Sequence, residues 1–263
     1  MIHWHVDPVL FTLGPISPRW YGVLFALSFV LSYYIMRAIF RNERKPLVDL
    51  DALTIYMIVG TILGARLGHV LFYEPQIIQE NPLELFAIWK GGLASHGGAL
   101  GIILGLYLFH RKRPAYGMVW LLDRLAIVAA ISGMCIRIGN LFNSEILGRP
   151  TDVPWAFVFE FEDMQPRHPA QLYEALLCLA LFILLWMMYK RGVAFSHPGR
   201  LIGTFLVLLF AGRFLIEFIK ERQVAFEAGL PLDMGQLLSL PFIAVGVWFL
   251  VRPSASQPAS RLQ

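Results

Sequence analysis

The residues that could do chemistry in this chain are mostly charged side chains placed in or beside apolar segments. Arg66, Arg137 and Arg213 each lie within or at the end of an apolar run, and Glu217 follows Arg213 by four positions. Each charge near the centre of a bilayer costs about 2.5–3.5 kcal/mol on the insertion scale. Residues four apart share a helix face, so Glu217 could neutralise Arg213 or could serve a site beside it. One acid cannot neutralise three arginines, and we therefore expect an anionic ligand.

His96 is the candidate proton acceptor. It opens an apolar run, and the glycines Gly97 and Gly98 that follow it would let a ligand approach backbone N–H groups. Imidazole titrates near about pH 6.5, so a histidine can accept a proton at neutral pH. The alternative is a histidine that bonds only to the backbone. His168, which precedes Pro169 at the entry to another apolar run, is better interpreted as structural.

The densest group of polar residues is the run from Arg137 to Arg149, directly after an apolar segment. Gly139 and Asn140 could end a helix there, and that capping role would be a purely structural explanation. It does not account for Arg137, Asn143 and Glu145 together. We expect this run to form a wall of the site.

The elements that must position these residues are predicted from composition and apolar runs. Of the 263 residues, 57% are apolar and 15% are charged, whereas soluble domains carry about a quarter charged residues. We predict an all-α integral membrane protein that forms a single membrane domain over residues 1–263. It has seven transmembrane helices, near 20–40, 52–73, 95–110, 119–138, 170–189, 201–219 and 236–251. Residues 1–19 form an outer lead-in and 252–263 a cytoplasmic tail.

The distribution of lysine and arginine predicts the orientation. The loops after the first, third and fifth runs, together with the tail, carry twelve of them. The lead-in and the other loops hold six: Arg19, Lys90, Arg149, Arg167, Lys220 and Arg222. Cytoplasmic loops are enriched in lysine and arginine, so we expect the N-terminus outside, the C-terminus in the cytoplasm and short outer-face loops. The net charge of +4 then reflects orientation, and nucleic-acid binding is not expected.

This orientation places most of the polar candidates toward the outer face. Tyr21, His96, Arg137 and His168 lie at outer ends of runs. Arg66, Arg213 and Glu217 fall in the outer halves of their runs. Asp123 and Arg124 lie at an inner end, where we interpret them as an interfacial pair.

Glycines recur at four-residue spacing in two runs, as Gly60, Gly64 and Gly68 and as Gly97, Gly101 and Gly105. This spacing predicts close helix packing. The histidines show no metal-binding spacing, and Cys135 and Cys178 both lie in apolar runs. We therefore expect no metal, no cofactor and no disulfide framework.

With these residues in view, nearly the whole chain resembles the bacterial prolipoprotein diacylglyceryl transferase family. The run after the fourth apolar segment is similar to the family signature, in Arg137, Gly139, Asn140, Asn143, Glu145 and Gly148. Further similar motifs follow in the expected order: Trp20-Tyr21-Gly22, Ser95-His96-Gly97-Gly98, Arg167-His168-Pro169, Gln171-Leu172-Tyr173-Glu174, Arg213 with Glu217, and Met234-Gly235-Gln236. The chain departs from the family at Ile136, at Leu141 and at Leu209, where some members have a tyrosine.

The resemblance implies transfer of the diacylglyceryl group of phosphatidylglycerol to the lipobox cysteine of a preprolipoprotein signal peptide. The thiol needs a base, for which His96 is suited. The leaving phosphate needs cations, for which Arg137 and Arg213 are suited, and the other expected substrate-binding residues are Tyr21, Gly97, Gly98, Asn140, Asn143, Glu145 and Glu217. Arg66 and His168 are secondary or structural candidates. The implied location is the bacterial inner membrane, with the active site toward the outer leaflet.

Two other classes of protein remain as alternatives. A transporter or channel for an anionic solute could use cations along a helical bundle, but it should place polar groups through the whole thickness of the membrane. Here they gather in the outer half. A lipid phosphatase would need a nucleophile, a base and a phosphate-binding cluster, and these cannot be assembled from the sequence.

Overall fold

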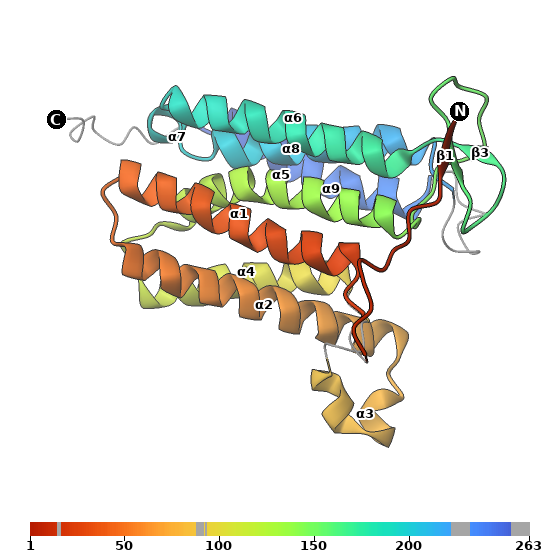
Figure 1. Cartoon of the computed structure of the whole chain (residues 1–263). Coiled ribbons are helices and arrows are strands. Elements are labelled where there is room, and N and C mark those ends of the chain that lie inside the picture. Colours follow the sequence, from red (N-terminus) through yellow and green to blue (C-terminus); the bar gives the residue numbers. More distant parts are fainter. Residues whose placement is uncertain (15–16, 88–91, 93, 222–231, 254–263) are drawn as a thin grey trace. The chain divides into compact units, whose positions relative to one another are not determined.

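The computed structural model describes residues 1–14, 17–87, 92, 94–221 and 232–253 (Figure 1). Within these ranges seven helices have 18 residues or more: α1 Trp20–Asn42, α2 Leu47–Tyr73, α4 Ser95–Lys112, α5 Met118–Phe142, α6 Ala170–Lys190, α8 Arg200–Glu217 and α9 Met234–Val251. Shorter helical turns are α3 Ile77–Glu80, the 3-10 helix η1 Pro82–Phe86 and α7 Val193–Ser196. Lys90, Arg222 and Arg261, which contribute to the predicted orientation, lie outside the described residues.

Each of the seven predicted apolar runs coincides with one long helix. The largest shift is at α2, which begins at Leu47 rather than near residue 52. Pro46 can precede a helix, and Asp49 in the first turn is favourable beside the positive end of the helix dipole. Asp49 and Asp51 therefore lie within α2, although both precede the apolar run that begins near residue 52.

Five of the described helices are long and apolar enough to cross a membrane, namely α1, α2, α5, α6 and α9. The other two long helices are more polar. Helix α4 begins with Ser95 and His96 and ends in a basic turn, and α8 contains Arg200, Arg213 and Glu217. The protein is thus a helical membrane protein by the length and composition of its helices.

A small sheet forms from the lead-in and the segment between α5 and α6. Its strands are β1 Ile2–Trp4, β2 Phe157–Phe159 and β3 Pro166–Arg167, in the order β1-β2-β3. Strand β1 runs parallel to β2, and β3 runs antiparallel to it. The all-α class is confirmed by the long helices, and the small sheet is an addition that the sequence does not predict, because strands of two or three residues are too short to show a period-2 pattern.

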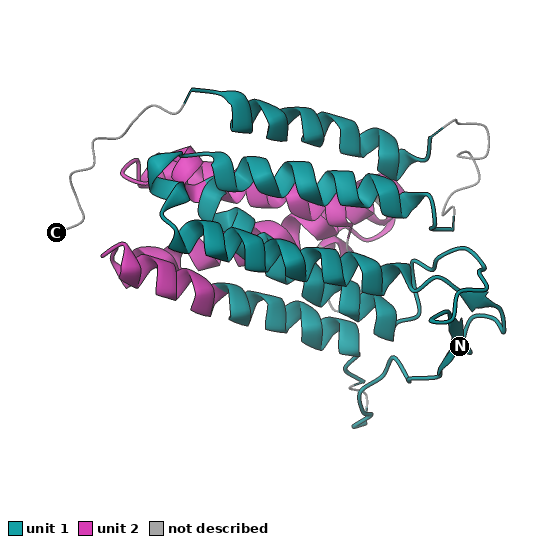
Figure 2. Cartoon of the chain, turned by 90° about the horizontal axis from the view of Figure 1, so that it is seen from above, with its two compact units in different colours: residues 1–32, 122–263 teal, residues 33–121 magenta. Residues whose placement is uncertain are grey.

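The described residues form two compact units, residues 1–32 with 122–263 (unit 1) and residues 33–121 (unit 2) (Figure 2). In unit 2 the predicted glycine contact between α2 and α4 is confirmed. A Cβ atom on Gly101 would overlap the carbonyl of Gly60, and one on Gly68 would lie 2.7 Å from the Cα of Gly97. The single membrane domain expected over residues 1–263 stays a prediction.

Unit 2 also contains an ion pair and an aromatic cluster between α2 and the segment before α5. Arg113 pairs with Asp49 at 2.6 Å, and the Tyr116 hydroxyl donates to the same carboxylate at 2.8 Å. Burial and this hydrogen bond raise the pKa of the Tyr116 phenol above its usual range. The ring of Tyr116 stacks on Phe40. These contacts tie α1 and α2 to the start of α5.

Asp123 joins α5 to α8 in unit 1. It is completely buried and accepts hydrogen bonds from the backbone N–H groups of Gly199, at 2.7 Å, and Ile202, at 3.0 Å. These groups belong to the first turn of α8, so Asp123 caps that helix from a neighbouring one. Arg124 is also buried and lies over the rings of Phe195 and Tyr189. The interpretation of Asp123 and Arg124 as an interfacial pair is therefore wrong.

Candidate active site

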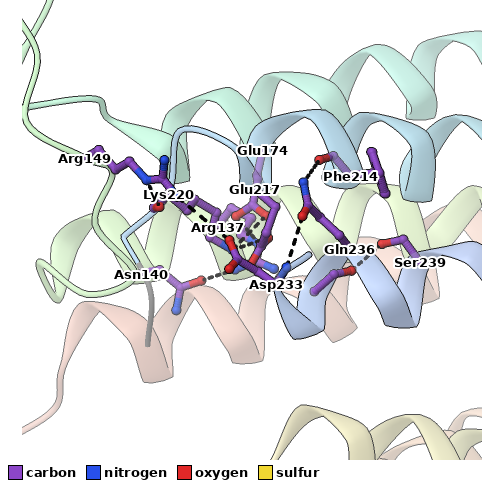
Figure 3. A network of polar contacts seen from close by, with 11 residues as sticks. Arg137, Asn140, Arg149, Glu174, Phe214, Glu217, Lys220, Asp233, Gln236 and Ser239 are labelled. Carbon is purple, nitrogen blue, oxygen red and sulfur yellow. Dashed lines mark hydrogen bonds and ion pairs between the residues drawn. The ribbon is translucent and has the colours of Figure 1, made fainter. Parts of the chain in front are cut away.

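Arg137 lies in the last turns of α5 and has an acidic partner. Its Nε atom is 3.1 Å from Oε2 of Glu174 on α6, and its Nη1 atom donates to Oδ1 of Asn140 at 3.4 Å. Figure 3 shows Arg137, Glu174 and Glu217 converging from α5, α6 and α8. The expectation that Arg137 lacks an acidic partner is wrong, because its partner Glu174 lies on a different helix.

Lys220, three residues after the end of α8, completes a buried charge cluster. Its Nζ atom lies 3.1 Å from Oε2 of Glu217 and 3.6 Å from Oε1 of Glu174. Lys220 and Glu174 have side chains that are only 4% and 5% exposed. We call Arg137, Glu174, Glu217 and Lys220 the charge cluster; its two cations and two acids balance. A charge inside a membrane protein needs such compensation.

A backbone pairing outside the helices holds Lys220 in place. Arg149 donates its backbone N–H to the carbonyl of Ile219 at 2.8 Å, and its Nε donates to the carbonyl of Lys220 at 3.0 Å. Gly148 in the same segment packs so closely on His168 that an added Cβ would lie 2.6 Å from the Cβ of that histidine. The glycine of the signature run is thus required by a close approach.

Glu145 is the centre of the rest of the signature run. Its carboxylate accepts hydrogen bonds from Asn140 at 2.8 Å and Asn143 at 3.4 Å, and its carbonyl accepts one from Gln171 at 2.6 Å. Ser144 and Ile146 on either side have left-handed backbone, with φ of 52° and 60°. Such strain in non-glycine residues concentrates at functional sites.

Two buried acceptors beside Glu145 lack hydrogen bonds. These are Oδ1 of Asn143 and Oε1 of Gln171, neither of which has a donor among the described residues. Buried polar atoms are normally satisfied.

Tyr21 on α1 lies against the same part of α5. A Cβ atom on Gly139 would lie 2.9 Å from Cδ2 of Tyr21, so the absence of a side chain at Gly139 admits the tyrosine ring. Tyr21 thus lies against α5 at Gly139, and its membership of the site stays a prediction.

Arg213 on α8 is the arginine without compensation. It is half-buried and has neither a hydrogen-bond nor an ion-pair partner in the part of the chain that the structure describes. The carboxylate of Glu217 pairs with Lys220 instead, so the interpretation of Arg213 and Glu217 as a self-neutralising pair is wrong. Glu217 also packs against Gly235, where an added Cβ would lie 2.5 Å from the carboxylate.

The two candidates in unit 2 differ from each other. His96 is exposed at the start of α4, its ring 5.1 Å from that of Phe72, and it has no hydrogen bond within the described ranges. Gly97 and Gly98 behind it are buried, and Gly97 packs on Gly64. Their substrate role stays a prediction, because helix packing already explains Gly97.

Arg66 is 3% exposed and donates to the carbonyls of Glu84 at 2.7 Å, Leu85 at 3.3 Å and Gly92 at 3.5 Å. Its guanidinium group binds the segment after α2. The structural alternative for Arg66 thus has direct support, and an anionic ligand is not needed to explain this arginine.

His168 and its neighbours hold the small sheet together. The Nδ1 atom of His168 lies 3.2 Å from the hydroxyl of Tyr173. Arg167 pairs with Asp163 at 2.5 Å and with Glu221 at 2.9 Å. The hydrogen bond from Arg167 lowers the pKa of the Asp163 carboxyl below its usual range. This setting favours the structural interpretation of His168.

Metal ligands do not cluster in the described residues: no group of three or more His, Cys, Asp or Glu side chains there could hold a metal ion. Cys135 and Cys178 are free and buried. The site described so far consists of arginine, lysine, carboxylate and amide groups. Such groups bind and stabilise anions by charge and hydrogen bonding.

These features define a helical membrane protein with a buried charge cluster and, on α8, an arginine that has no polar partner among the described residues. The sequence profile of the family "Prolipoprotein diacylglyceryl transferase" matches residues 8–252, and the chain belongs to this family. It is 48% identical to the "Phosphatidylglycerol--prolipoprotein diacylglyceryl transferase" of Chloroherpeton thalassium, over 94% of this chain and 92% of the relative. It is 49% identical to the protein of the same name from Tolumonas auensis, over 94% and 95%. The Porphyromonas gingivalis protein of that name is 45% identical, over 95% and 94%.

Proposed function

We propose that this protein transfers the diacylglyceryl group of phosphatidylglycerol to the lipobox cysteine of a prolipoprotein. The observation that carries the proposal is the match to the family over residues 8–252, together with relatives of that name at 45–49% identity along almost their whole length. The comparisons give no support to the alternative of an anion transporter.

The reaction forms a carbon–sulfur bond and breaks a carbon–oxygen bond. The thiol proton passes to a base, and the cysteine thiolate attacks the glyceryl carbon that carries the phosphate. The bond from this carbon to the phosphate oxygen breaks, and glycerol phosphate leaves. The developing charge on the leaving phosphate needs cations in a site shielded from water. This reaction requires neither a nucleotide nor a metal ion.

Arg213 is the proposed primary ligand of the lipid phosphate, since its charge is uncompensated among the described residues. Arg137 is the proposed second cation. Asn140, Asn143 and Glu145 form the adjoining wall and, through Asn140, contact Arg137. Tyr21 and Glu217 complete the proposed lipid site.

His96 is proposed as the base that accepts the thiol proton. It belongs to unit 2, whereas Arg137 and Arg213 belong to unit 1. Its exposed ring lacks a hydrogen bond in the described part of the chain, which leaves both ring nitrogens available. Gly97 and Gly98 are proposed to admit the substrate beside it.

The proposed topology has seven crossings, with the N-terminus outside. Strands β1 and β2 pair with each other, and Ile2 donates to the carbonyl of Ala156 at 2.8 Å. The two strands must therefore lie on one side of the membrane, and an even number of crossings must separate them. Helices α1, α2 and α5 are candidates for three of these crossings, which supports α4 as the proposed fourth.

The same parity argument applies to α8. Residues 147–149 pair with residues 219–221, since Glu221 donates to the carbonyl of Leu147 at 3.0 Å. Two crossings must separate these segments, and α6 supplies one, so α8 supplies the other. With α9 the total is seven, which puts the two termini on opposite sides. The distribution of lysine and arginine then selects the N-terminus as the outer one.

The proposed location is the bacterial inner membrane, with the site toward the outer leaflet. In this topology the loop after α5, the end of α8 and the start of α4 all lie at the outer face. The charge cluster lies between the first two of these segments. A secreted substrate and an outer-leaflet lipid both reach that face.

The proposal is tested with purified protein in mixed micelles of phosphatidylglycerol and a synthetic peptide that contains a lipobox cysteine. We expect the peptide to gain the mass of one diacylglyceryl group on cysteine, with release of glycerol phosphate. Micelles of phosphatidylethanolamine, and a peptide with serine in place of cysteine, are the negative controls. An unmodified peptide under conditions in which the protein stays folded would rule out this function.

A further inference from the structure

Glu174 is the acid of the charge cluster that contacts both cations. Its Oε2 lies 3.1 Å from Nε of Arg137, and its Oε1 lies 3.6 Å from Nζ of Lys220. Glu217, by comparison, pairs with Lys220 at 3.1 Å. The charges therefore alternate in the order Arg137, Glu174, Lys220, Glu217, as Figure 3 shows.

The way in which Glu174 binds Arg137 leaves the far end of the guanidinium group available. The carboxylate occupies Nε, and Asn140 accepts a long hydrogen bond from Nη1 at 3.4 Å. Nη2 has no partner among the described residues. An arginine held through Nε can still offer its Nη groups to a phosphate oxygen.

The sharing of Glu174 between two cations also affects the charge that Arg137 presents. A carboxylate paired with Arg137 alone would cancel most of the attraction of that arginine for an anion. Lys220 takes up part of the negative charge of Glu174, and Glu217 balances the rest of Lys220. Arg137 thus keeps part of its positive charge although the cluster as a whole is neutral.

We propose that Glu174 is a positioning residue that orients Arg137 toward the lipid phosphate, and that Lys220 holds Glu174 in this role. The inference rests on the proposed function, because it assumes that Arg137 binds the phosphate. Neither Glu174 nor Lys220 needs to touch the lipid. Both act through Arg137, and this predicts how their substitutions combine.

The first test is Glu174→Gln, which keeps the size of the side chain and removes its charge. We expect kcat with phosphatidylglycerol to fall by about one to two orders of magnitude, because the ion pair that orients Arg137 is lost. The loss should appear in kcat more than in KM, because the leaving phosphate gains charge during the reaction. In an Arg137→Gln background the same substitution should cost nothing further.

The second test uses Lys220, with variants that separate charge from shape. Lys220→Arg keeps a cation beside both acids and should retain most of the activity, whereas Lys220→Met should lose it. The double variant Glu174→Gln with Lys220→Met removes one acid and one cation. It should be no slower than Glu174→Gln alone, because both residues act through Arg137.

The matched control is Asp49→Asn, which breaks the 2.6 Å pair with Arg113 in unit 2. It should lower Tm and leave kcat unchanged. A Glu174→Gln protein, or the charge-balanced double variant, with parental kcat and KM would overturn the inference. Additive losses from Glu174→Gln and Arg137→Gln would also overturn it, because they would show independent roles. An inactive parent protein would instead overturn the proposed function.

Discussion

The three candidate arginines, Arg66, Arg137 and Arg213, differ in what surrounds their guanidinium groups. Arg66 binds three backbone carbonyls, and Arg137 binds a carboxylate and an amide. Arg213 has no partner in the described ranges. An unpaired charge within a membrane helix is costly, so an anionic ligand is the simplest reason to retain it.

Arg213→Gln should therefore affect function and not folding. We expect turnover to fall by about one to two orders of magnitude, equivalent to about 1.5–3 kcal/mol of lost transition-state stabilisation. Tm in detergent should not fall, because Arg213 has no hydrogen bond or ion pair to lose in the described part of the chain. Arg66→Gln should behave in the opposite way and lower Tm, since it removes the guanidinium group that binds three backbone carbonyls. Full turnover by a folded Arg213→Gln protein would exclude a phosphate role.

His96 makes a prediction about pH. A base must be neutral to accept a proton, so the parent rate should rise with pH as the base loses its proton. His96→Gln keeps an N–H donor but cannot accept the proton, so it should be slower and lose this rise. If its rate and pH profile match those of the parent, the thiol is deprotonated by another group. His168→Gln serves as the matched control, because it should keep the parental slope.

The sequence predicts Arg137, Arg213 and Glu145 as site residues, because an intramembrane charge and a dense polar run are visible in one dimension. It missed the roles of Glu174 and Lys220. Glu174 was only one residue of a motif, and Lys220 was counted as a loop cation. Their function depends on α5, α6 and the end of α8 meeting in space. Pairings across such sequence distances leave no spacing pattern.

The glycine spacing in α2 and α4 determines how closely these two helices pack. Gly60 and Gly64 on α2 face Gly97 and Gly101 on α4, and the backbones touch where a side chain would otherwise stand. Helices that pack this closely gain dispersion contacts, which replace the hydrophobic effect inside a bilayer. The position of His96 at the start of α4 depends on this contact.

Gly101→Ala should separate α2 from α4. Its Cβ would overlap the carbonyl of Gly60, which belongs to a helix backbone and cannot move aside easily. We expect a loss of about 1–3 kcal/mol, typical of an overpacked interior, measured as a lower Tm or lower resistance to denaturant. Gly117→Ala is the control, because no atom lies within 4 Å of its added Cβ. An unchanged Tm for Gly101→Ala would show that the helices can move apart at no cost.

At the scale of whole elements the sequence predicted all seven long helices, because long apolar runs mark them directly. It did not predict the strands. Strands β1 and β2 lie at opposite ends of a segment that contains four long helices. The apolar segment that contains Phe157 and Phe159 is too short to be told from a loop by sequence. Its role becomes visible only in the structure, where Trp4 and Leu141 pack against these two rings.

The whole molecule is predicted to have its N-terminus outside, and labelling can test this. Both natural cysteines are buried, so single introduced cysteines can report the side on which they lie. Met164→Cys, at an exposed site between β2 and β3, should react in intact cells with a thiol reagent that cannot cross membranes. Ser196→Cys, exposed between α6 and α8, should react only after the cells are opened. The reverse pattern would invert the topology.

Helix α1 is divided between the two units, since unit 1 includes residues up to Ser32 and unit 2 begins at Tyr33. Synthesis of residues 33–121 takes about 4–18 s at about 5–20 residues per second. Unit 2 is complete when the ribosome reaches its last residue, whereas the first half of α1 still awaits its partners. Ser32, for example, must wait for Ser132, to which it is hydrogen-bonded at 3.0 Å in the finished protein. During synthesis the first half of α1 must therefore remain helical in lipid without its partners. This is possible because the backbone hydrogen bonds of a helix are satisfied within the helix.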